Sequence, residues 1–270
     1  MKKTNKINIQ LPDFNIELLG NNTPTNKVLF YPCCGSDIID AISYFHPLVD
    51  TFFFCDSGRN VADRNRNRKI KENLPDFNLY KSTEECIWEK NTYEIPFRSQ
   101  LVNGRNRINE PHLYKRVTTK LTQIWKNEKD NKKITIIRVV GDGYEVFTND
   151  EMLKQIGIFF YRGDGTGEGG SDVRWLETEK DIGYSCGGIG RHFDVVLQKI
   201  ANKGLIVTDG SNCGKEYGFF KQYWRDPGNA ASFDDSATKD GNIFKCIGKI
   251  TERYGPTLVW QIEKVNEITV

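Results

Sequence analysis

The feature that most constrains the fold is the stretch 27–58, in which two short apolar runs flank a polar-capped segment. The runs 28–31 and 51–55 are rich in aromatic residues, and continuous runs of this kind are typical of strands buried on both faces. Between them, residues 36–45 begin with Ser and Asp, which favour the start of a helix. A strand, a helix and a strand in this order form a βαβ unit, whose crossover makes the two strands parallel.

Further apolar runs along the chain extend this pattern. Strands are expected at 133–140, 157–161 and 204–208, and a helix is expected at 192–201, where apolar residues recur on one face. The last two apolar runs lie within 244–264 and are joined by a short connection, which predicts an antiparallel hairpin. The fold class that we predict is therefore α/β, with a Rossmann-like, mostly parallel sheet flanked by helices.

One region interrupts the order of strands and helices. Several short β-like pieces occupy 77–98, and we interpret them as an inserted hairpin. Apolar residues spaced by three and four predict a helix over 111–125, which Pro111 would open. We expect a single α/β domain over 1–270, with its core at about 27–264 and a β-rich insertion at about 77–110.

Composition excludes several classes of protein. Hydrophobic residues make up 38% of the 270 residues, which is enough for a substantial core, and the formal charge of +2 does not indicate a nucleic-acid partner. No apolar run approaches the roughly 20 residues of a membrane span. Seven cysteines without C-x-x-C spacing favour a reduced, cytoplasmic protein with no zinc knuckle. The basic run within 59–73 is either a solvated helix or loop, or a phosphate-facing patch.

Five aspartates lie at or just past the C-terminal ends of predicted strands. In an open parallel sheet the carboxyl ends of the strands share one edge, where ligands bind. Carboxylates gathered there repel one another unless a divalent cation, a bound basic group or a raised pKa compensates. The alternative for each is an ordinary turn or cap residue. The five residues are Asp37, Asp56, Asp142, Asp164 and Asp209.

Two glycine-rich segments add candidate chemistry. The loop 162–172 follows a buried strand and carries Asp164 and Glu168, so it suits a cation or an amine better than a phosphate. The alternative is a flexible surface loop. The second segment leads through Arg191 and His192 into the predicted helix and could bind an anion. His192 is either an acid or base in a reaction, or a surface histidine near a helix cap.

The order of these elements resembles the class I, S-adenosylmethionine-dependent methyltransferase fold. That family has βα units that build a parallel sheet, and its last two strands form a hairpin that makes one strand antiparallel. The resemblance covers roughly 27–264, with an insertion between the second and third strands. It is a resemblance of element order, because the first loop has a single glycine and no Asn-Pro-Pro-Tyr type motif is present.

The resemblance implies roles for particular residues. The first loop would meet the methionine end of the cofactor S-adenosylmethionine through Cys34 and Gly35, with Asp37 beside them. The acid that holds the ribose would be Asp56, and the acid near the adenine would be Asp142. The loop after the fourth strand would hold the methyl acceptor, which makes three of its residues the catalytic candidates. These candidates are Arg162, Asp164 and Glu168.

Three functions remain open from the sequence. The first is a methyltransferase-like protein that binds a small-molecule ligand, a nucleoside cofactor, and whose methyl acceptor is unknown. The second is a metal-dependent hydrolase of a phosphoester or nucleotide, in which Asp164 and Asp209 hold Mg²⁺ or Mn²⁺ and Arg162 or Arg191 binds phosphate. The third is a non-catalytic Rossmann-like binding module.

Overall fold

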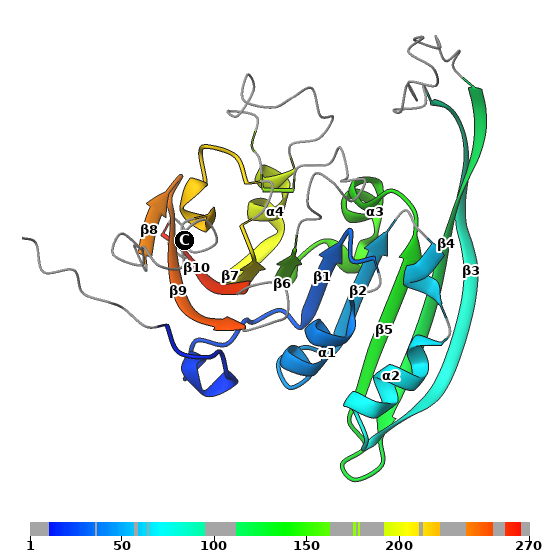
Figure 1. The fold of residues 1–270 in the computed structure, drawn as a ribbon, viewed down its shortest axis with the longest axis horizontal. Coiled ribbons are helices and arrows are strands. Elements are labelled where there is room, and N and C mark those ends of the chain that lie inside the picture. The colour runs from blue at the N-terminus through cyan, green and yellow to red at the C-terminus, as the bar shows by residue number, and fades with distance from the viewer. Residues whose placement is uncertain are drawn as a thin grey trace, which may run out of the picture.

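The computed structural model describes residues 11–35, 37–56, 59–63, 65–94, 112–162, 175–176, 178, 192–210, 213–221, 236–250 and 257–265. These residues form one ten-stranded mixed sheet with four α-helices (Figure 1). The strands lie in the order β3-β4-β5-β2-β1-β6-β7-β10-β9-β8. The predicted α/β class is confirmed.

The centre of the sheet is a block of five parallel strands. Each is paired in parallel with its neighbours within the block. Burial explains why these runs become central strands, since all six residues of β6 are buried and the middle residues of β2 are buried on both faces. The five strands are β1 (Val28–Pro32), β2 (Thr51–Asp56), β5 (Lys133–Val140), β6 (Ile156–Tyr161) and β7 (Ile200–Thr208).

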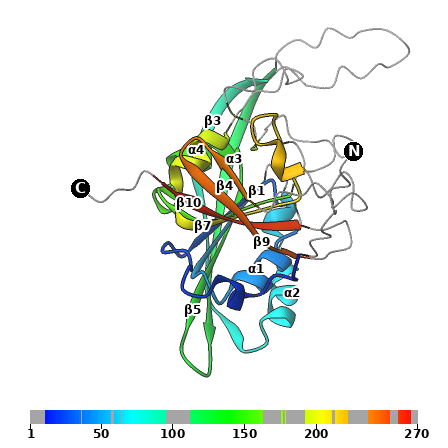
Figure 2. The same cartoon turned by 90° about the vertical axis from the view of Figure 1, so that its left-hand side faces the viewer.

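Antiparallel strands extend the sheet at both ends. Among the described strands, five of the nine pairings are antiparallel, so the expectation of a mostly parallel sheet is not confirmed. The predicted C-terminal hairpin is confirmed as the β9–β10 pair. Figure 2 shows how the twist of the sheet turns this hairpin across the direction of β5. The added strands are β3 (Phe77–Glu94), β4 (His112–Asn127), β8 (Ser236–Lys239), β9 (Asn242–Ile250) and β10 (Thr257–Lys264).

The predicted helix over 111–125 is wrong, because this segment is most of β4. It pairs with β3 on one side and with β5 on the other. Three alternate residues, Leu121, Gln123 and Trp125, are buried, which is the period of a strand. The inserted β-rich segment therefore continues past residue 110 and becomes part of the main sheet.

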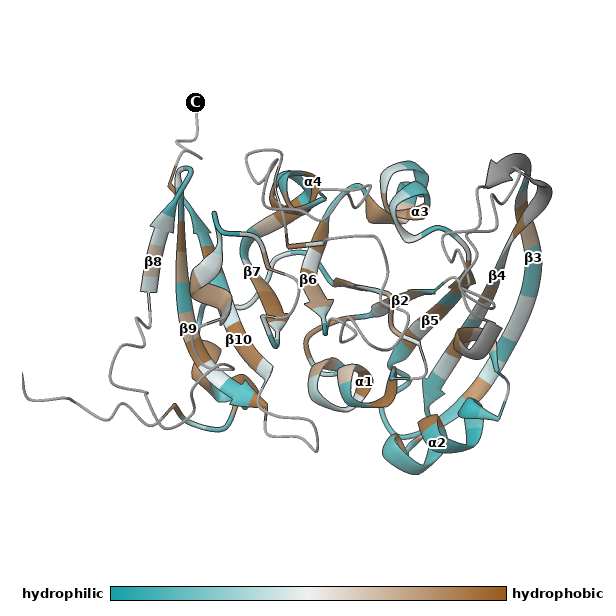
Figure 3. Ribbon diagram, turned by 45° about the horizontal axis from the view of Figure 1, so that its top comes forward, coloured by the Kyte–Doolittle hydropathy of each residue, from teal (hydrophilic) through white to brown (hydrophobic). Residues whose placement is uncertain are grey.

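The helices cover both faces of the sheet. The core residues of α1 and α2 pack in one hydrophobic cluster and those of α3 and α4 in a second. Figure 3 shows the brown, hydrophobic residues concentrated in the central strands, while α2 is mostly hydrophilic. The expected helix at 192–201 is confirmed as α4, whereas α3 was not predicted. The helices are α1 (Ile39–Phe45), α2 (Arg66–Asn73), α3 (Gly143–Asn149) and α4 (Phe193–Lys199), with 3-10 turns at Ile16–Leu19, Arg59–Ala62, Glu151–Leu153 and Gly218–Lys221.

The β3–β4 hairpin rises past the carboxyl ends of the parallel strands. The pairing of β4 with β5 ends at Thr119 and Val140, but β4 continues its pairing with β3 as far as His112. The hairpin therefore stands as an arm at the edge where the candidate site lies (Figure 1). No described helix is long and apolar enough to cross a membrane.

Candidate functional site

The carboxyl ends of the parallel strands bring several predicted residues to one edge of the sheet. Asp56 ends β2, and Asp142 and Asp209 follow β5 and β7. Gly35 lies in the turn after β1, and Arg162 directly follows β6. Since β5, β2, β1, β6 and β7 are consecutive in the sheet, these five residues line a single edge.

Asp56 connects the turns that follow three of these strands. Its carboxylate Oδ2 accepts a hydrogen bond of 2.8 Å from the backbone N–H of Gly35. Its carbonyl oxygen accepts a second bond of 2.9 Å from the backbone N–H of Gly141. Through these two bonds Asp56 fixes the first loop and the start of the Asp142 turn relative to each other.

The first loop is a tight turn with an open outer surface. Cys33 and Gly35 both have positive φ angles, 54° and 50°. The N–H groups of Cys34 and Asp37 donate to the carbonyls of Cys55 and Cys34, so these amides and that of Gly35 all bond within the protein. Among the described residues other than the chain neighbours of Gly35, no atom lies within 4 Å of the position that a Cβ on this glycine would take. A ligand can therefore approach the backbone at Gly35, although these three amides do not form an anion cradle.

Burial sets the protonation of the thiols beside the loop. It raises the pKa of Cys34 well above its usual value, and the charge of Asp56 adds to the increase. It likewise raises the pKa of Cys55, with neighbouring Cys33 as the next contributor. Both groups are therefore neutral thiols at pH 7, which suits packing against a ligand rather than nucleophilic chemistry.

Asp142 begins α3. Its side-chain Oδ1 accepts a hydrogen bond of 2.9 Å from the backbone N–H of Glu145, which is the bond of an N-cap residue. The signal was present in the sequence as Asp142 followed three residues later by Glu145, a capping-box pattern. The cap fixes Asp142 at the end of β5, next to Asp56.

Arg162 forms an ion pair with α1 and the turn before it. Its Nη1 lies 2.7 Å from Oδ2 of Asp37 and 3.4 Å from Oδ2 of Asp40, and its guanidinium lies over the Phe160 ring at 5.0 Å. The Tyr31 hydroxyl donates to the same Asp37 oxygen at 3.2 Å. Burial raises the pKa of Asp37, and the nearby Arg162 opposes this increase. These ion pairs connect the residue that follows β6 with the segment that follows β1. A catalytic role for Arg162 stays a prediction.

His192 is buried, so the interpretation of this residue as a surface histidine near a helix cap is wrong. Its ring stacks on Tyr144 with centroids 3.8 Å apart and meets the edge of Trp175 at 5.0 Å. Burial lowers the pKa of His192 to about 4, although the charge of Asp142 acts in the opposite direction. The ring is therefore neutral at pH 7. Sequence reasoning missed Tyr144 and Trp175, since neither belongs to a recognisable motif.

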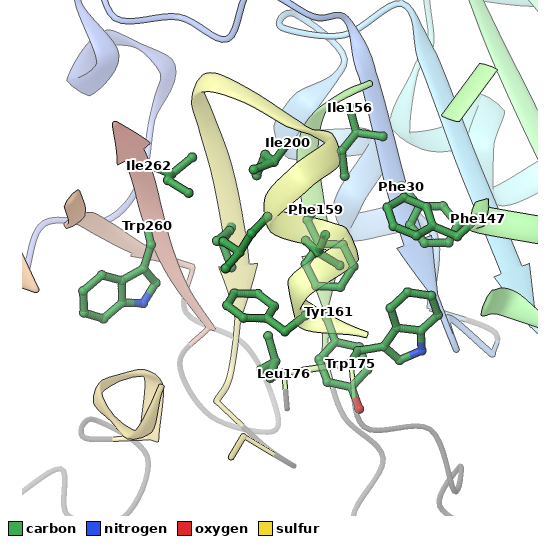
Figure 4. Packing of buried hydrophobic residues seen from close by; sticks show 14 of the residues in the cluster. Phe30, Phe147, Ile156, Phe159, Tyr161, Trp175, Leu176, Ile200, Trp260 and Ile262 are labelled. Carbon is green, nitrogen blue, oxygen red and sulfur yellow. The ribbon is translucent and has the colours of Figure 1, made fainter. Parts of the chain in front are cut away.

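Trp175 fixes the α3 side of this edge. Figure 4 shows its ring beside Phe30 of β1 and Phe147 of α3. A Cβ on Gly143 would lie 3.2 Å from its Cζ2 atom, so the indole packs directly on the first residue of α3. This contact holds the Asp142 turn against the end of β1.

Two residues of the basic run within 59–73 make local contacts. Arg68 pairs with Glu72 at 2.9 Å on the exposed surface of α2. Lys71 Nζ donates to the carbonyls of Pro75 and Phe77 at 2.7 and 3.0 Å. These contacts favour the solvated-helix interpretation over a phosphate-facing patch.

Several predicted site residues lie outside the described residues. They are Asp164, Glu168, Arg191 and the remainder of the glycine-rich segments at 163–172 and 186–190. Among the residues that the structure describes, no group of three or more His, Cys, Asp or Glu side chains is arranged to hold a metal ion. Comparison with protein-family models gave no match, and comparisons with curated proteins and with solved structures gave none either.

Proposed function

We propose that this protein binds a nucleoside cofactor at the carboxyl edge of its sheet, as a methyltransferase-like protein that uses S-adenosylmethionine. The order of the parallel strands supports this. We number the five parallel strands 1 to 5 in chain order, which is β1, β2, β5, β6, β7. Across the sheet they then lie in the order 3-2-1-4-5, which is how the strand order of dinucleotide-binding folds begins. Next come β10, which is antiparallel to β7, and β9, which pairs antiparallel with β10, as in the hairpin of the methyltransferase fold.

The observation that carries the proposal is the pair of hydrogen bonds at Asp56. They join Asp56 and the Asp142 turn to Gly35, which follows β1. The strand order reverses between β1 and β6, and ligands bind outside the carboxyl ends of strands at such a point. The open surface at Gly35 fits the close approach of a cofactor. In this arrangement Asp56 would bind the ribose hydroxyls and Asp142 would lie near the base.

The remaining predicted residues would serve the other end of the cofactor. Cys34 and Gly35 would border the methionine portion, with the Asp37–Arg162 pair next to it. Bound S-adenosylmethionine would supply an electrophilic methyl group. The chain's own contribution would be to orient the cofactor and, through Arg162, Asp164 and Glu168, to position the acceptor.

The test is calorimetric titration with S-adenosylhomocysteine and adenosine. Asp56→Asn keeps an acceptor for the Gly35 amide but removes the charge, so the first loop should stay folded while affinity falls about five- to tenfold. Asp209→Asn is the matched control, because Asp209 follows β7, which ends at the same edge two strands away from β1. Equal losses in both variants, or thermal stabilisation by Mg²⁺ or Mn²⁺ with none by adenosyl compounds, would contradict the proposal.

A further inference from the structure

Three aromatic rings run in series from the core to the surface at the edge of the candidate site. Trp175 is fully buried, His192 is 6% exposed and Tyr144 is 36% exposed. The Trp175 and His192 rings meet edge to face at 66°, and the His192 and Tyr144 rings are nearly parallel at 16°. One face of the Tyr144 ring is therefore covered by His192, and a substantial part of the remainder is accessible to solvent.

The support behind Tyr144 is rigid. It lies in the first turn of α3, directly after the Asp142 cap and the Gly143 contact with Trp175. Phe147, one turn further along α3, stacks on Phe30 of β1 with centroids 4.5 Å apart. A ring held in this way loses little conformational freedom when a planar ligand stacks on it.

Tyr144 closely follows a turn that Asp56 holds at the candidate edge. The backbone N–H of Gly141 bonds to the Asp56 carbonyl, so the turn that leads to Tyr144 is tied to the end of β2. Burial lowers the pKa of His192 to about 4, so the ring behind Tyr144 carries no charge at pH 7. The stacked pair of Tyr144 and His192 thus offers an aromatic surface rather than a cation.

We propose that Tyr144 is the platform on which the base of the bound nucleoside stacks, and that His192 is the positioning residue behind it. This inference rests on the proposed function and names the part of the ligand that the α3 side of the edge recognises. Every nucleobase has a flat π face, so stacking on a tyrosine favours a planar heteroaromatic ring over an aliphatic one.

The test measures the dissociation constant of adenosine for a series of variants. Tyr144→Leu should weaken binding about tenfold or more, while Tyr144→Phe should keep it within about threefold, since stacking depends on the ring. Tyr80→Leu is the control, because Tyr80 is an exposed tyrosine on β3. Circular dichroism would check that each variant is folded.

The variants at His192 test whether this ring positions Tyr144 for binding or only stabilises the folded protein. His192→Phe keeps a flat ring behind Tyr144 and should retain binding, whereas His192→Ala should weaken it with a smaller loss than Tyr144→Leu. If the wild-type protein binds adenosine and Tyr144→Leu binds it equally well, the proposal that the base stacks on Tyr144 is wrong while the proposed function stands. If the wild-type protein binds neither adenosine nor S-adenosylhomocysteine, both the proposed function and the platform are wrong.

Discussion

The close packing of Gly141 on Thr118 allows a quantitative test of the edge geometry. An added Cβ on Gly141 would lie 2.6 Å from Cγ2 and 2.9 Å from Oγ1 of Thr118. Carbon atoms in contact prefer about 3.5–4.0 Å, so one side must move by roughly 1 Å. Thr118 is fully buried and β-branched, which leaves its side chain little freedom to turn away. We therefore expect Gly141→Ala to lower the free energy of unfolding by about 1–3 kcal/mol.

A second substitution should remove the penalty. Thr118→Ala deletes both close atoms, and the Thr118 hydroxyl has no hydrogen-bond partner in the described part of the chain, so its loss should cost little. In that background Gly141→Ala should be neutral or stabilise by up to about 1 kcal/mol, because alanine reduces the entropy of the unfolded chain. The coupling energy between the two sites, which is the difference between these two effects, should therefore be about 1–4 kcal/mol.

Urea unfolding of the four proteins, followed by circular dichroism, measures this coupling. Adenosine binding provides a second readout, since movement of Gly141 displaces Asp142 from its place beside Asp56. The single variant should bind more weakly, and the double variant should recover. If Gly141→Ala has the same effect with and without Thr118→Ala, the arm does not pack on this turn as described.

Three further outcomes follow from buried contacts. Gly157→Ala should greatly reduce the yield of folded protein, because the added Cβ would lie 2.0 Å from the backbone oxygen of Asn26. This clash is with the main chain, so no side-chain rotation can relieve it. Lys120→Met should cost about 1–3 kcal/mol in urea unfolding, since the partly buried carboxylate of Asp150 loses the ammonium that lies 2.8 Å away and keeps the hydrogen bond from the Met152 backbone N–H. His192 titrates at about pH 4 in the folded protein and about 6.5 when unfolded, so the unfolded chain binds the proton more readily. Stability should therefore fall by about 1–3 kcal/mol between pH 6.5 and 4, and a His192→Phe variant with an unchanged pH profile would refute this.

Part of the candidate site could be predicted from the sequence, because the path of the backbone alone determines which residues reach the edge of the sheet. Strands joined by βα crossovers run parallel, so the residues that follow them must reach the same edge. On this basis Gly35 and Asp56 were expected together, and their hydrogen bond joins them. The burial of His192 was not predictable, because Tyr144 and Trp175 lie 48 and 17 positions away in the chain and cover it only after folding.

The sequence by itself determined the buried central strands and the C-terminal hairpin, because continuous apolar runs between turn residues have few other stable arrangements. Only the tertiary structure decided that the segment of β4 is a strand. Its apolar residues have helical spacing, and the polar Gln123 conceals the alternation of a strand. That glutamine is buried because its side-chain oxygen accepts a bond of 2.7 Å from Arg138 of β5. A buried polar residue is stable only where a partner satisfies it, and that partner comes from a strand that folding brings alongside.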